Sequence, residues 1–274
     1  MSAQETIISA DKMGKQYLGD LWRYRELFLF LAWRDLLVRY KQTVAGVAWS
    51  VVRPLLTMLI LTLVFGHLGK MPSLGVPYPL LVLCGLLPWQ FFSTALADGG
   101  NSLVANTSLI SKVYFPRLLV PASALMTALV DFMISLMLLG GLLFWYRWLP
   151  PATFLWLPLF ILMACALSFG AGVWVAALTV RYRDFRFIVP FVVQFGLYMS
   201  PVGFLSTVVP DSYRLLYSLN PMVGVIDGFR WCLLGGGAGV EVTSIAMSCV
   251  ITGVLLWFGI RRFRRMEREF ADLV

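Results

Sequence analysis

Charged residues are scarce in this chain: Asp, Glu, Lys and Arg together make up 13% of its 274 residues, whereas hydrophobic residues make up 59%. Soluble domains carry about twice that share of charge. The mean hydropathy of +0.81 agrees with this imbalance. The composition therefore excludes a soluble globular protein and indicates an integral membrane protein.

The sequence also lacks the patterns that carry catalysis or metal binding. It contains one histidine, His67, and no GxxxxGK[ST] loop for nucleotide phosphates, because its two Gly-Lys pairs are followed by Gln16 and Met71. The cysteines stand singly, without CxxC or metal-ligand spacing: Cys84, Cys165, Cys232 and Cys249. We therefore predict no catalytic residue, no metal site and no cofactor on this chain. Any chemical energy source is expected on another polypeptide.

Six apolar stretches are each long enough to cross a bilayer, whose hydrocarbon core of about 30 Å takes roughly 20 helical residues. Their continuous apolar character favours helices over the alternating strands of a transmembrane β-barrel. We predict an all-α integral membrane protein with six transmembrane helices: Val44–Gly66, Val76–Ala97, Leu118–Tyr146, Phe154–Val180, Phe187–Ser206 and Val242–Ile260.

Lysine and arginine are distributed unevenly between the two sides of these spans. One side receives eighteen of them, and the other receives only Lys70, Arg147, Arg214 and Arg230. Because cytoplasmic segments retain basic residues, both termini are predicted to be cytoplasmic. Residues 1–20 and 261–274 are then cytoplasmic tails around a six-helix domain, residues 44–260. The net charge of +8 reflects this topology, so we predict no nucleic-acid-binding face.

The segment 21–41 is predicted to form an amphipathic helix before the first span. At 100° per residue its aromatic residues gather on one side and its arginines on another. This pattern is typical of an interfacial helix with its aromatic side in the headgroup boundary and its cations facing anionic lipid. Simple anchoring is one interpretation. The other is contact with an anionic substrate, for which the phosphate-binding candidates are Arg39, Lys41 and Arg53.

Residues 98–117, DGGNSLVANTSLISKVYFPR, are too polar to lie in the membrane. Gly99 and Gly100 open this segment, and Pro116 disfavours a helical residue before it. We predict a short helix over 102–114. Such a helix can dock on a soluble partner or serve only as a connection.

Four motifs resemble, in the same order, the permease subunits of bacterial polysaccharide-export ABC transporters, which move O-antigen, capsule or teichoic acid chains. They are RYKQTVAGVAWSVVRPLLTMLI, LISKVYFPR, RYRDF and SPV…LNPM…R, and the resemblance extends from about Tyr17 to Arg265. It implies a homodimer in the bacterial inner membrane, joined by two copies of an ATPase subunit that holds ATP and Mg. The substrate would be a lipid-linked polysaccharide.

The same resemblance makes the LISKVYFPR segment a coupling helix that seats on the ATPase. The residues implied in this contact are Ser108, Leu109, Ile110, Ser111, Lys112, Val113, Tyr114 and Phe115. It also implies short re-entrant helices before the last span, over about 207–239. The residues agree, because Pro210, Pro221 and a glycine run interrupt that apolar segment.

An aromatic stripe on the fifth span has helical spacing, with Phe187, Phe191, Phe195 and Tyr198 at i, i+4, i+8 and i+11. Such stripes usually pack against neighbouring helices. The alternative is a channel lining that offers a sugar chain many weak sites. Trp89, Phe91 and Phe92 form a second, less regular set.

Asp131 lies near the middle of the third span, where a charged carboxylate costs about 2.5–3.5 kcal/mol. The sequence offers no evident intramembrane cation beside it, so we predict an interhelical hydrogen bond. An ion-coupled secondary transporter would also use such a residue and is therefore an alternative function. A small-molecule or lipid ABC exporter is another. A membrane glycosyltransferase is a third, but it needs an acid, base or metal cluster that the sequence does not supply.

Overall fold

The computed structural model describes residues 19–41, 46–235 and 241–267, and within these ranges the regular elements are all helices. The all-α prediction is confirmed. In chain order the elements are α2 (Arg25–Lys41), α3 (Gly46–Leu61), η1 (Thr62–Leu68), α4 (Tyr78–Ala105), α5 (Thr107–Lys112), α6 (Leu119–Trp145), η2 (Ala152–Trp156), α7 (Leu157–Arg181), α8 (Phe185–Met199), η3 (Ser206–Val208), α9 (Asp211–Tyr217), α10 (Pro221–Leu234) and α11 (Val242–Met266).

Five helical segments of the described chain are long and apolar enough to cross a membrane: Ala48–Leu68, Tyr78–Ala105, Leu119–Trp145, Ala152–Arg181 and Val242–Met266. They correspond to five of the six predicted spans. The first combines α3 with the π-helical η1, in which the Gly69 N–H donates to the carbonyl of Val64. The predicted start of this span, Val44, lies outside the described residues.

The predicted fifth span, 187–206, is wrong at its carboxyl end, because α8 ends at Met199. Ser200 is extended (φ −103°, ψ 152°), as expected for a residue before proline. The 15 residues of α8 reach about 22 Å at 1.5 Å per residue, less than the hydrocarbon thickness. A sixth crossing therefore stays a prediction.

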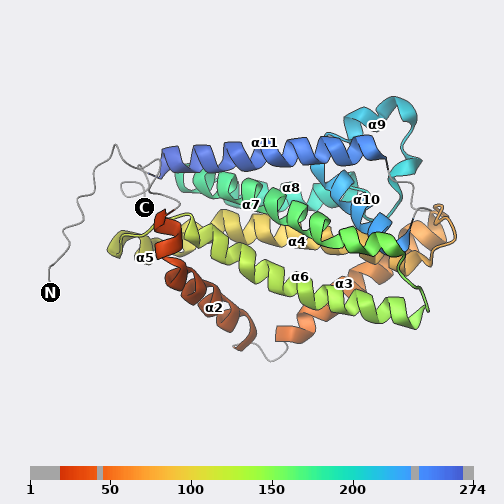
Figure 1. Cartoon of the computed structure of the whole chain (residues 1–274), viewed down its shortest axis with the longest axis horizontal. Helices are drawn as coiled ribbons and strands as arrows, with labels where there is room; N and C mark the ends of the chain where they lie inside the picture. Colours follow the sequence, from red (N-terminus) through yellow and green to blue (C-terminus); the bar gives the residue numbers. More distant parts are fainter. Residues whose placement is uncertain (1–18, 42–45, 236–240, 268–274) are drawn as a thin grey trace.

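Helix α4 is the central element of the bundle. It packs against α6 and α7, and α7 in turn packs against α11, so that these four helices run side by side (Figure 1). The contact between α7 and α11 is made backbone to backbone. A Cβ on Gly259 would lie only 2.3 Å from the carbonyl oxygen of Gly170, which is the close approach that small residues permit between membrane helices.

The helix predicted over 102–114 is wrong in its start and length. Gly99 and Gly100 do not break the chain but lie inside α4, where a Cβ on Gly100 would meet the Val175 side chain of α7 at 2.7 Å. These glycines therefore allow α4 to approach α7. The break comes at Asn106, and only the six residues Thr107–Lys112 form α5.

A second hydrophobic cluster, separate from the main core, lies at the end of the bundle that carries α5. We call it the α5-end cluster. It contains buried side chains from α2, α4, α5, α6, α7 and α11, among them Leu31, Leu103, Ile110, Val120, Val173 and Phe263. Helix α5 therefore shares one apolar core with five longer helices, α2, α4, α6, α7 and α11.

The segment predicted as re-entrant forms η3, α9 and α10, at the end of the bundle opposite α5 (Figure 1). Helix α10 packs against α4, α7 and α11, and its residues from Met222 to Arg230 are all buried. The prediction of short helices is confirmed for the described part. Residues 236–240 lie outside it.

Candidate functional site

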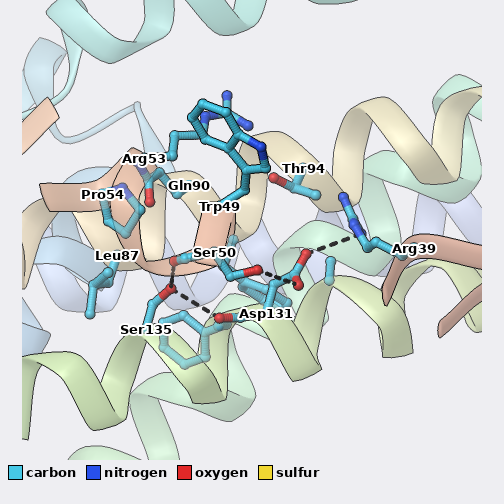
Figure 2. A pocket seen from close by; sticks show the side chains of 13 residues that line it. Arg39, Trp49, Ser50, Arg53, Pro54, Leu87, Gln90, Thr94, Asp131 and Ser135 are labelled. Carbon is cyan, nitrogen blue, oxygen red and sulfur yellow. Dashed lines mark hydrogen bonds and ion pairs between the residues drawn. The ribbon is translucent and has the colours of Figure 1, made fainter. Parts of the chain in front are cut away.

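A cavity of about 210 Å³ lies between the carboxyl end of α2 and helices α3, α4 and α6 (Figure 2). Its apolar lining includes Trp49, Phe91 and Phe132, and its polar lining includes Arg39, Ser50, Arg53, Gln90 and Asp131. A concave site with an apolar wall and a few convergent polar groups is the usual form of a ligand site.

Asp131 of α6 is held by three donors. Its Oδ2 lies 3.1 Å from Nη1 of Arg39, and its Oδ1 accepts hydrogen bonds from the Tyr40 hydroxyl and, at 3.3 Å, from Ser50 Oγ. The predicted interhelical hydrogen bond is confirmed. The expectation that no cation lies beside Asp131 was wrong, because Arg39 comes from α2, an element outside the predicted spans.

Arg39 bridges two carboxylates from different spans. Its Nη2 lies 3.3 Å from Oδ2 of Asp98 on α4, in addition to the contact with Asp131. The neighbouring Tyr40 is affected by the same cluster. Burial, and secondly the hydrogen bond to Asp131, raise the pKa of its phenol, so Tyr40 stays a hydrogen-bond donor at neutral pH.

The three predicted phosphate-binding residues are not all in one place. Arg39 and Arg53 line the cavity, Arg53 from α3, whereas Lys41 lines a different groove on the outer side of α2, with Phe30 and Trp33. Within the residues that the structure describes, Arg53 forms no ion pair. The cavity therefore holds one arginine that is paired with acids and one that is not.

A helix is present where the amphipathic one was predicted, and its interfacial role stays a prediction. The expectation that its cations face lipid was wrong for two arginines. Arg34 Nη2 donates to Asp35 Oδ1 at 2.8 Å and to Asn106 Oδ1 at 2.7 Å, and Arg39 faces α4 and α6. The side that carries Phe30 and Trp33 is exposed. The apolar side of α2 is thus available to lipid, while Arg34 and Arg39 bind the protein because the bundle supplies acceptors.

The eight residues expected in the coupling contact divide into anchors and an exposed tip. Ile110 and Phe115 are buried in the α5-end cluster. Ser108 and the run from Ser111 to Tyr114 are exposed, and Leu109 is half-buried. Ile110 and Phe115 therefore fix the segment to the bundle, and the residues between them, Ser111 to Tyr114, form an exposed tip.

The aromatic stripe on α8 is exposed at all four positions: Phe187, Phe191, Phe195 and Tyr198. The rings of Phe191 and Phe195 contact each other in a tilted arrangement, with centroids 4.3 Å apart and an interplanar angle of 41°. The stripe therefore does not serve packing within this chain. By contrast, Trp89 and Phe91 of the second aromatic set are buried in the main core.

A buried arginine joins the pieces of the SPV…LNPM…R motif. Arg230 of α10 donates to the carbonyls of Phe204 at 2.8 Å, Val202 at 2.9 Å and Leu81 at 3.3 Å. Asn220 Nδ2 also donates to Ser200 Oγ at 2.9 Å. Asp227 lies three residues before Arg230 on α10, and the two charged groups are 3.9 Å apart. Sequence reasoning missed the carbonyl partners, since a backbone acceptor leaves no signal in the sequence.

Comparison with known proteins gives one family and several relatives. Residues 26–234 match the family described as ABC-2 type transporter. The chain is 28% identical over 263 residues to the O-antigen export system permease protein RfbA of Klebsiella pneumoniae, covering 95% of this chain and 98% of that protein. It is 30% identical over 258 residues to the protein of the same name from Myxococcus xanthus, covering 93% and 98%. The polysialic acid transport protein KpsM of Escherichia coli is 24% identical over 244 residues, covering 87% and 92%.

Proposed function

Because this chain belongs to the ABC-2 type transporter family, we propose that it is the permease subunit of an exporter that moves a lipid-linked polysaccharide across the inner membrane. The observation that carries the proposal is the similarity to export permeases over 93% or more of this chain. The substrate would be of the O-antigen, capsule or teichoic acid type.

The energy source in this proposal is a separate ATPase that binds ATP and Mg and is present in two copies. It would press on the exposed tip from Ser111 to Tyr114. The anchors Ile110 and Phe115 lie in the α5-end cluster, which α2, α4, α6, α7 and α11 share. Because closely packed apolar side chains transmit displacement, a push on α5 would move several helices together.

The proposed orientation in the membrane is supported by basic residues at the end of the bundle that carries α5. Helix α11 ends with the basic residues Arg261, Arg262, Arg264 and Arg265, beside the end that carries α5 (Figure 1). The positive-inside rule supports a cytoplasmic location for this end. With α8 as a sixth crossing, both termini would be cytoplasmic.

A homodimer would supply twelve crossings and a path between two copies. The exposed stripe of α8 from Phe187 to Tyr198 is the proposed channel lining, since its rings are not used for packing inside the chain. The phosphate of the lipid carrier would bind at the cytoplasmic side, through Arg39 and Arg53 in the cavity, with Lys41 on the outer groove.

The proposal is tested by reconstituting the permease with its ATPase in vesicles and measuring ATP hydrolysis and export together. The double variant Lys112→Ala/Tyr114→Ala should lower partner-dependent hydrolysis and export at least fivefold without changing thermal stability, because both side chains are exposed. Lys70→Ala, exposed at the opposite end, is the matched control. ATP hydrolysis by the purified permease alone would contradict the division of labour.

A further inference from the structure

The two carboxylates that contact Arg39 are held very differently. Asp131 is 21% exposed and accepts from Tyr40 and Ser50 as well as from Arg39. Asp98 is 44% exposed, and among the described residues its only polar contact is the 3.3 Å contact with Arg39. Asp131 is therefore a fixed partner of Arg39, and Asp98 is a loosely held one.

The charges of this site balance only while Asp98 remains in place. Arg39 and Arg53 bring two positive charges, and Asp98 and Asp131 bring two negative charges. If the Asp98 side chain turns away into water, the cavity keeps a net positive charge. Two guanidinium groups then face the cavity, and guanidinium is the side-chain group best suited to bind phosphoryl oxygens in pairs.

The positions of Asp98 on α4 and Asp131 on α6 allow Asp98 to leave Arg39 while Asp131 stays in contact with it. Asp98 lies one turn along α4 from Thr94, which lines the cavity, but Asp98 itself does not line it. Its carboxylate therefore reaches Arg39 from the rim, where water can solvate it after release. Asp131, Ser50 and Arg53 line the wall itself (Figure 2), so Asp131 keeps Arg39 oriented during the exchange.

We propose that Asp98 is a displaceable counterion, which occupies the place on Arg39 that a phosphoryl group of the substrate takes, with Arg53 as the second cation. This inference rests on the proposed function and deepens it by naming how the site recognises the anionic end of its substrate. Neutral ligands gain nothing from displacing Asp98, whereas a phosphoryl group replaces its charge. The exchange therefore selects for substrates that carry phosphate.

The test measures binding of inorganic pyrophosphate to the purified permease in neutral detergent by titration calorimetry. Asp98→Asn should tighten binding about tenfold, because it removes a competing negative charge within a few ångströms of the bound anion. Asp131→Asn should bind no more tightly than wild type, because Arg39 then loses the partner that orients it toward the cavity, while Asp98 still competes for it. Arg39→Gln and Arg53→Gln should each weaken binding at least tenfold.

Lys70→Gln is the matched control, because Lys70 is exposed and does not line the cavity, so binding should be unchanged. Thermal stability of every variant in the same detergent identifies any that fails to fold. A second arm places the permease in phosphatidylcholine nanodiscs with or without phosphatidic acid. If phosphatidic acid competes with pyrophosphate, the site takes a phosphoryl group carried by a lipid. If pyrophosphate binding is undiminished, the site takes a phosphoryl group exposed to water.

Three results overturn the inference: no pyrophosphate binding by the folded wild type, unchanged or weaker binding in Asp98→Asn, or tighter binding in Asp131→Asn alone. Because the measurement uses neither the ATPase nor transport, these results are distinct from a failure of the proposed function. Loss of partner-driven export would leave the binding result standing.

Discussion

Replacing Arg230 by methionine is the most demanding test of the packing described above. The Arg230 side chain is 0% exposed and donates to carbonyls of α4 and of the irregular segment that follows α8. Methionine has a similar length but no donor. The substitution therefore leaves the carbonyls of Val202 and Phe204 without this partner and Asp227 without its counterion.

The size of the effect follows from these contacts. A hydrogen bond to a charged group contributes about 1.5–3 kcal/mol, and removing one member of a buried ion pair costs about 3–5 kcal/mol. The two terms describe overlapping interactions, so we expect a loss of about 4 kcal/mol in the free energy of unfolding. This corresponds to a fall on the order of 10 °C in Tm.

The assay is thermal unfolding of the detergent-solubilised permease, with Arg214→Met as the matched control. Arg214 also pairs with acids, Asp211 and Glu241, but it is 35% exposed. We therefore expect its replacement to cost about 1 kcal/mol or less. Adding Asp227→Asn to Arg230→Met should recover part of the loss, since it removes the uncompensated charge. Equal Tm values for the two arginine variants would refute the reasoning, and no recovery in the double variant would refute its electrostatic part.

Three further predictions use the same preparation. Gly259→Leu should lower Tm by several degrees, because its Cβ would lie 2.3 Å from a carbonyl oxygen of α7. Gly253→Leu should leave Tm unchanged, because nothing lies within 4 Å of a Cβ at that position. Equal losses in Tm would contradict the close contact between α7 and α11. Phe115→Ala should cost about 3–5 kcal/mol because that ring is buried, while Tyr114→Ala should leave Tm unchanged. Phe195→Ala should leave Tm unchanged but lower the export rate in vesicles, and normal export would argue against a channel role for the stripe.

The long helices were predictable from the sequence because apolar length is a property of a contiguous segment. The spans around α4, α6, α7 and α11 agree with the prediction to within a few residues at most ends. The larger errors concern glycine and proline. Gly99 and Gly100 were predicted to open the polar segment, whereas they lie inside α4 and allow its contact with α7. Pro201 ends α8 earlier than its apolar composition suggests.

The candidate site was predictable only in part. The arginines of the segment before the first span stood out as an anion-binding possibility, and two of the three candidates do line one cavity. The acids that hold Arg39 were not identified as its partners, because Asp98 and Asp131 belong to different spans far along the chain. Nor could the sequence separate the buried anchors of the coupling segment from its exposed tip.

The sequence by itself determined the environment and the building blocks of this protein. Its composition requires a membrane, its apolar runs require helices that satisfy their own backbone hydrogen bonds, and its basic residues favour one orientation. Only the tertiary structure decided which polar groups meet, such as Arg39 with two aspartates and Arg230 with three carbonyls. The physical reason is that hydropathy acts along the chain, whereas ion pairs, hydrogen bonds and close helix contacts depend on which surfaces the packed helices bring together.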